Sequence, residues 1–153
     1  MSLSNEKHMN TKLYQQVYAL AGELLTAAQT HADEQFAALY EQLRAICLDN
    51  EGDKHKNHPV QWETLGDFTE NTVEALAFYD KAITVAQAID AHDYLASIHY
   101  AIALLLTEDE DAPITNRTAK ALAAAQRAHN YAAKTSDVEL QRDITALLTA
   151  LQC

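Results

Sequence analysis

Apolar residues recur along most of this chain at the three- and four-residue spacing of amphipathic helices. The pattern predicts helices over residues 11–30, 33–48, 72–89, 92–107, 114–134 and 137–151, with a short helix over residues 60–65. Residues 49–59 are polar throughout except for a closing proline, and they predict a loop. Only three glycines and two prolines occur, which disfavours a turn-rich β fold. We therefore expect an all-α protein of about six helices.

Residues that start and stop helices refine these limits. Gly66 is expected to close the short helix, and Pro113 is expected to mark the start of the helix over residues 114–134. Asp67 and Asn71 each have a glutamate three residues later, so either can cap the helix that begins near residue 72.

One pattern occurs three times along the chain. It consists of an Ala-rich helix, a corner that contains aspartate, and a second helix. The corners lie at Asp33, Asp93 and Asp137, which are 60 and 44 residues apart. Recurring helix pairs predict a solenoid, and solenoids usually serve as binding surfaces.

Two short segments resemble a known family. Residues 74–83 read EALAFYDKAI, and residues 65–68 read LGDF. The first resembles the second helix of a tetratricopeptide repeat of the longer variety, and the second is similar to the turn of that repeat, with about one extra helical turn before Ala75. The resemblance implies a right-handed stack of antiparallel helix hairpins with a concave groove that binds a peptide or protein. It implies no catalytic residues. A plain helical bundle is the alternative.

The chain has 153 residues, which is the length of one domain. We expect a single helical domain over residues 11–153 and a flexible N-terminus over residues 1–10. Met9 is a candidate alternative start, and residues 1–8 are not expected to belong to the fold. No signal sequence or apolar run of membrane-spanning length is visible, and a cytoplasmic location is expected.

Cys47 and Cys153 do not form a disulfide framework, and Cys47 falls on an apolar helix face.

The net charge of −11 narrows the classes of partner. Such a surface repels phosphate, which argues against nucleic acids and anionic membranes as partners. It favours a basic peptide or protein. A short stack also exposes apolar surface at its ends, which leaves self-association open.

The sequence offers little support for chemistry at a metal or cofactor. His55 and His58 lie three residues apart beside acidic residues, so they are weak zinc candidates in a polar loop. No zinc-protease, diiron or phosphate-loop motif is present. We expect a protein without cofactor, resident metal or catalytic activity.

Aromatic and polar residues on the helices are the candidates for partner contact, because tyrosine and tryptophan are favoured at interfaces. The predicted contact residues are Gln35, Tyr40, Arg44, Trp62, Tyr94, His99 and Tyr100. Together these observations favour a non-catalytic adaptor or chaperone-like module that binds a peptide or protein in a helical groove. One alternative is an immunity or antitoxin-like protein that neutralises a basic partner. A second is a helical bundle that binds a metal or small ligand.

Overall fold

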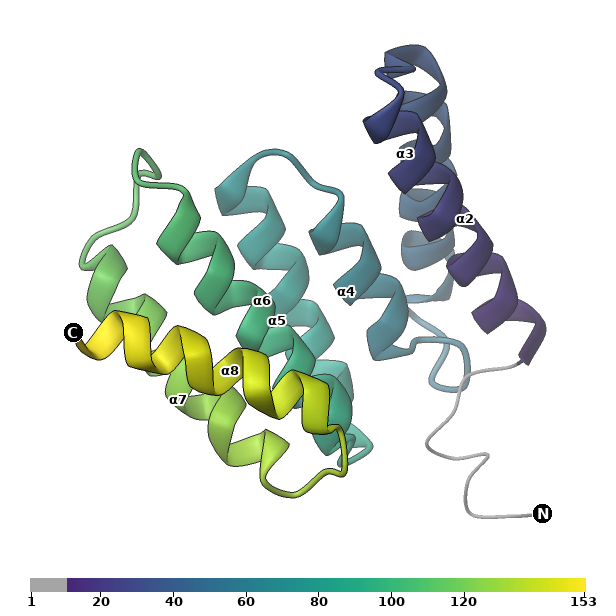
Figure 1. Cartoon of the computed structure of the whole chain (residues 1–153). Helices are drawn as coiled ribbons and strands as arrows, with labels where there is room; N and C mark the ends of the chain where they lie inside the picture. The colour runs from purple at the N-terminus through teal and green to yellow at the C-terminus, as the bar shows by residue number, and fades with distance from the viewer. Residues whose placement is uncertain (1–10) are drawn as a thin grey trace.

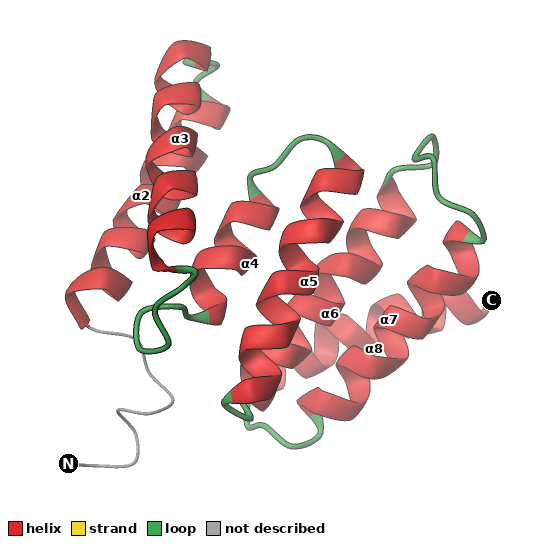
Figure 2. Ribbon diagram, turned by 180° about the vertical axis from the view of Figure 1, so that it is seen from behind, coloured by secondary structure: helices red, strands yellow, loops and turns green. Residues whose placement is uncertain are grey.

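A computed structural model describes residues 11–153 of the chain, and within that range it contains seven helices and no strand (Figures 1 and 2). The expectation of an all-α fold is confirmed. The helices are α2 (Thr11–Gln29), α3 (Asp33–Asn50), α4 (Pro59–Asp67), α5 (Thr72–Ala88), α6 (His92–Glu108), α7 (Arg117–Ala132) and α8 (Val138–Gln152). The predicted flexible N-terminus lies outside the described residues.

The helices follow one another across the molecule in chain order, from the α2–α3 hairpin at one end to α7 and α8 at the other (Figure 1). Each helix contacts its neighbours in the chain. In addition, α2 contacts α4, α4 contacts α6, and α6 contacts α8, so these four helices form a continuous layer. Helices α3, α5 and α7 form an open layer, because they contact only their chain neighbours among the described helices. This arrangement is compatible with a helical repeat and with a bundle.

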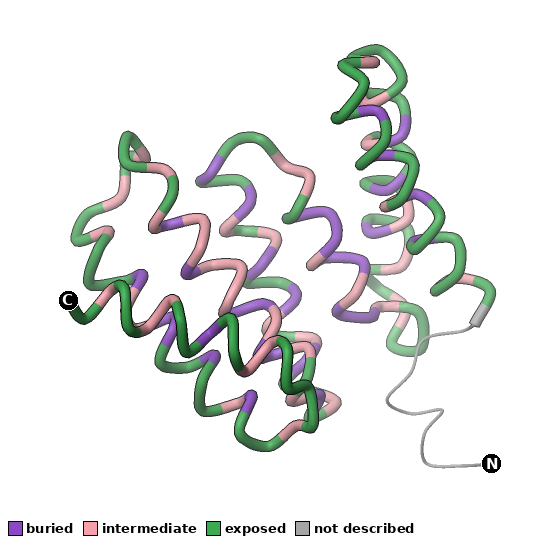
Figure 3. Tube along the Cα trace, viewed as in Figure 1, coloured by how far each residue is buried: buried purple, intermediate pink, exposed green. Residues whose placement is uncertain are grey.

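The core lies between the two layers (Figure 3). Its largest fully buried side chains include Trp62, Leu24, Leu43, Leu65 and Ile98. Helix α7 presents mainly alanines to the core, and these small side chains let it pack closely on α6. Within residues 11–153, no helix combines the length and apolar character needed to cross a bilayer.

The first two predicted corners share one backbone geometry. His31 and Asp90 both adopt left-handed conformations, with φ of 56° and 54°. After each of them, a backbone N–H reaches back to close the helix, from Ala32 to Ala27 O at 2.9 Å and from Ala91 to Ala86 O at 3.0 Å.

The third corner differs, because Asp137 caps α8 by accepting a hydrogen bond from Leu140 N at 3.0 Å. The first corner leads from the continuous layer to the open layer, and the second leads back again. The corners at Asp33 and Asp93, which are 60 residues apart in the sequence, therefore do not occupy equivalent positions in the helix arrangement.

Gly66 lies within α4 instead of closing it at residue 65. A Cβ atom at this position would lie 2.7 Å from the ring of Tyr79 on α5. The glycine is thus required for the close approach of α4 and α5. Asn71 caps α5 by accepting a hydrogen bond from Glu74 N at 3.0 Å, as one of the two predicted alternatives requires.

The prediction that Pro113 starts a helix is wrong. Helix α7 begins at Arg117, because Asn116 adopts a left-handed conformation with φ of 56° that separates Pro113 from the helix. The guanidinium of Arg117 donates to the carbonyls of Leu106 and Thr107, which satisfies acceptors at the end of α6.

Candidate functional site

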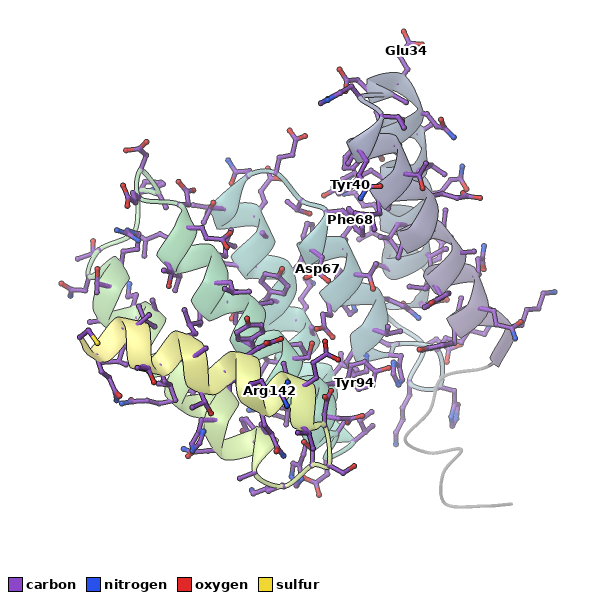
Figure 4. The ribbon with its side chains drawn as sticks, viewed as in Figure 1. Glu34, Tyr40, Asp67, Phe68, Tyr94 and Arg142 are labelled. Atoms are coloured by element: carbon purple, nitrogen blue, oxygen red, sulfur yellow. The ribbon has the colours of Figure 1, made fainter. Side chains whose placement is uncertain are left out.

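Gaps in the open layer form two hollows on the molecule. The first, which we call the aromatic cleft, has a volume of about 1000 Å³. It opens between α3 and the start of α5, and the segment joining α4 to α5 forms its base. Figure 4 shows Tyr40 and Phe68 close to each other in this region. Its lining residues are Ala28, His31, Asp33, Phe36, Ala37, Tyr40, Glu41, Asp67, Phe68, Thr69, Glu70, Asn71 and Glu74.

Three half-buried aromatic residues line the base of the aromatic cleft. Phe36 and Tyr40 are four residues apart on α3, so their rings lie on one face and stack at 6.4 Å. Phe68 meets Phe36 edge-on at 6.3 Å. The hydroxyl of Thr69 donates to Leu65 O at 2.7 Å, so the Tyr40 hydroxyl, 2.7 Å away, is the donor to Thr69. This chain of hydrogen bonds ties α3 to the end of α4.

The rim of the aromatic cleft is acidic. Five carboxylates line it, and no lysine or arginine does so; the carboxylates belong to Asp33, Glu41, Asp67, Glu70 and Glu74. Loss of surrounding water raises the pKa of Asp67 to about 6, although part of the residue still reaches solvent, and a 2.7 Å hydrogen bond from Tyr79 opposes that rise. With a pKa of about 6, the Asp67 carboxyl is mostly ionised at neutral pH.

The second hollow, which we call the apolar groove, has a volume of about 640 Å³. Helices α5 and α7 form its walls, and α6 forms its floor. Most of its lining is apolar, with Val73, Leu76 and Ile83 on α5 and Ile102 and Leu106 on α6. Its charged lining residues are Asp80 on α5 and Lys120 and Arg127 on α7.

The structure separates the predicted contact residues. Tyr40 lines the aromatic cleft, whereas Gln35 and Arg44 are exposed elsewhere on α3. Tyr94 and Tyr100 are half-buried on α6, and Tyr94 lies well away from Tyr40 in Figure 4. Because α3 and α6 are not in contact, these residues do not form one surface.

Two of the predicted contact residues belong to the interior. Trp62 is 1% exposed and donates a hydrogen bond of 2.7 Å to Asn57. His99 is 7% exposed and stacks on Tyr131 with ring centroids 5.5 Å apart. Burial and the nearby charge of Arg127 lower the pKa of His99 to about 4, so this residue is neutral at pH 7. It reaches the apolar groove only from the floor.

His55 and His58, the weak zinc candidates, lie in different surroundings in the structure. His58 is buried and caps α4, where its Nδ1 accepts a hydrogen bond from Val60 N at 3.2 Å. His55 is exposed in the loop. Among the described residues, no three histidine, cysteine or acidic side chains are grouped to hold a metal ion. Cys47 is fully buried, and burial raises the pKa of its thiol to about 12, which disfavours a nucleophilic thiolate.

Sequence reasoning did not assign Phe36, Phe68 and Thr69 to a site. Phe36 was read as part of the apolar stripe of its helix and Phe68 as part of a turn, and both are partly buried against the core. A usable signal was nevertheless present, because Glu70 and Glu74 follow Phe68 closely and Asp33 precedes Phe36. Acidic residues that flank aromatic residues at a helix end indicate a surface that is both aromatic and acidic.

Comparisons of the chain with protein-family models, with curated proteins and with solved structures found no match.

Proposed function

We propose that this protein is a non-catalytic interaction module that binds a basic peptide or protein segment in the aromatic cleft. The observation that carries the proposal is the combination of three aromatic rings and five carboxylates in a hollow lined by no lysine or arginine. Lysine and arginine side chains are attracted both to aromatic faces and to carboxylates. The aliphatic stem of such a side chain would pack on the rings while its charged head meets the acidic rim.

The sequence pattern of α4 and α5 supports a likeness to tetratricopeptide repeats. The family pattern places a tryptophan three residues before a Leu-Gly pair, and an alanine four residues before an aromatic residue in the second helix. Trp62, Leu65 and Gly66 follow the first part, with Thr69 in place of the tyrosine of the pattern, and Ala75 and Tyr79 follow the second. Leu65 and Gly66 lie within α4, so they match the first helix of the repeat and not its turn. The contact of Gly66 with Tyr79 gives this pattern a physical reason. We therefore infer a stack of helix hairpins that presents gaps between its helices to partners.

A direct test uses a fluorescent Lys-rich peptide and a Glu-rich peptide of the same length, with binding followed by anisotropy. Glu70→Gln with Glu74→Gln removes two charges from the rim, and we expect at least about a tenfold loss of affinity for the Lys-rich peptide. Glu108→Gln with Glu110→Gln removes the same charge outside the cleft and is the matched control. Equal losses in both variants would indicate non-specific attraction to an acidic protein and would overturn the proposal.

The same titration separates an adaptor from an immunity-like protein. An adaptor surface binds several basic sequences and loses them as salt is raised, because exposed charge pairs are screened. A protein that neutralises one basic partner is expected to retain that partner at high salt, through apolar contacts that no simple peptide reproduces.

Self-association is a further part of the proposal. Tyr14, Tyr18 and Leu25 are exposed on one face of α2, at the end of the described helices, and the two tyrosine rings stack at 6.4 Å. An apolar stripe at the end of a helix stack supports pairing with a second copy. Sedimentation of wild type and of Tyr18→Glu at several concentrations tests it.

A further inference from the structure

The apolar groove differs from a simple crevice, because it has two helical walls and a helical floor. Helices α5 and α7 each pack on α6 but make no contact with each other along their described lengths. A hollow of this shape runs along the helix axes and is open at the surface between them. Val73, on the α5 wall, is 52% exposed, which leaves an apolar side chain in water beside Leu76 and Ile83.

The α7 wall is basic within an acidic protein. Residues 112–136 contain four of the eleven lysines and arginines and no aspartate or glutamate, whereas the whole chain has a net charge of −11. Lys120 and Arg127 line the groove, and both are exposed. Neither has a carboxylate within 4.0 Å in residues 11–153. The groove thus presents two available cations along one edge.

The spacing of these cations selects the shape of the partner. Lys120 and Arg127 are seven residues apart, which is about two helical turns or roughly 10 Å along the axis. Carboxylates seven residues apart on another helix have the same separation. Asp80 on the opposite wall repels acidic groups, so it disfavours a partner with carboxylates on both flanks.

We propose that the apolar groove binds an acidic amphipathic helix, with leucine or isoleucine side chains on the α6 floor and carboxylates along the α7 edge. This surface shares no lining residue with the aromatic cleft and takes a partner of opposite charge. Apolar anchors in a groove supply affinity, and charge pairs at the edge fix the orientation.

The probes are two labelled peptides of about 18 residues, five helical turns, with the same leucine face. One carries glutamates seven residues apart on one polar flank, and the other carries lysines there. We expect the glutamate peptide to saturate the wild-type protein below about 1 mM. Lys120→Glu with Arg127→Glu should weaken it at least about tenfold, whereas Lys134→Glu with Arg142→Glu, an equal change of charge outside the groove, should leave it within about twofold.

A second pair of variants tests the α5 wall and leaves the cations of the α7 edge unchanged. Val73→Asp places a carboxylate in the groove, and Val138→Asp places one at an exposed valine outside it. Both valines lie at the start of a helix, where aspartate is tolerated, so both variants should keep the wild-type circular dichroism spectrum.

We expect Val73→Asp alone to weaken the glutamate peptide by about tenfold or more. Failure of that peptide to saturate the wild type, or equal effects of groove and control variants, would overturn the proposal. The binding of a Lys-rich peptide to the aromatic cleft is measured separately, so the two proposals fail independently.

Discussion

The aromatic cleft and the apolar groove are two versions of the same gap. Each lies between successive helices of the open layer, α3 and α5 in the first case and α5 and α7 in the second. The cleft has aromatic rings and five carboxylates, whereas the groove has aliphatic side chains and two available cations. The helix arrangement therefore supplies the hollows, and the side chains on their walls set the charge that each one presents.

The difference follows from where acidic residues fall along the chain. Glu70 and Glu74 come just before and within the first turn of α5, where they also favour the helix dipole. Helix α7 has no acidic residue in its first turn and carries its charge as lysine and arginine. One fold can thus present opposite charges at neighbouring gaps.

The largest effect is expected at the contact that supports both hollows. Gly66→Ala forces a methyl group against the buried ring of Tyr79, whose hydroxyl is held by Asp67, so we expect a loss of about 1–3 kcal/mol of unfolding free energy. Binding at both hollows should weaken, since α5 is a wall of each. Gly22→Ala is the control, because a Cβ there meets nothing within 4 Å and should stabilise α2 by about 0.5–1 kcal/mol. Urea unfolding measures both, and similar values would refute the packing argument.

Reversing the charge of the acidic rim tests whether the two hollows bind their peptides separately. Glu70→Lys with Glu74→Lys should reduce the affinity for a Lys-rich peptide by more than about tenfold and leave binding at the apolar groove unchanged. Glu108→Lys with Glu110→Lys makes the same change in net charge away from the cleft. The two hollows would not be distinct if the reversal at the rim also altered binding at the groove beyond the change seen in this control.

A third variant tests the contact between α4 and α6 in the continuous layer. Glu63 on α4 is half-buried and accepts a hydrogen bond of 2.5 Å from Ser97 on α6. Burial, followed by the charge of Asp67, raises its pKa to about 8. The folded protein favours the protonated form of Glu63. The resulting gain in unfolding free energy is fully present below about pH 4.5 and is lost as the pH rises to about 8.

Glu63→Gln keeps an acceptor for Ser97 without the charge. We expect this variant to exceed the wild type by on the order of 1 kcal/mol at pH 8, and to match it near pH 4.5. Urea unfolding at both pH values gives the comparison, and the exposed Glu108→Gln serves as control. A difference independent of pH would show that ionisation of Glu63 is not its cause.

The smallest effect is expected for Tyr40→Phe. This change removes the hydrogen bond to Thr69 but leaves the stacked ring and the bond from Thr69 to Leu65, so the cost is about 0.5–1.5 kcal/mol. Tyr18→Phe, at a residue that is 72% exposed, should cost almost nothing. Thermal unfolding of the pair reports whether the hydroxyl ties α3 to α4.

Helical periodicity was sufficient to predict the helices. The stripe from Phe36 to Cys47 and the cap at Asn71 are local features, and local features determine where such helices begin and continue. The start of α7 was predicted three residues early, because the left-handed conformation of Asn116 depends on how the chain turns back towards α6. Proline alone does not reveal that turn.

The hollows were harder to predict. Tyr40 was predicted to be a partner-contact residue, but the cleft that it lines was not predicted, since the cleft exists only because α3 and α5 stay apart. Trp62 and His99 have the chemistry of interface residues, yet the packing of α4 against α5 and of α6 against α7 buries them. Which aromatic residue remains accessible depends on the spacing of whole helices, and no short sequence pattern encodes that spacing.

Helix α5 is the wall that the two hollows share. A displacement of α5 towards α7 would widen the aromatic cleft and narrow the apolar groove. Two ligands that favour opposite positions of α5 would then compete without touching, and each would lower the affinity of the other by the same factor. A single helix would in that case make the protein a switch between a basic and an acidic partner.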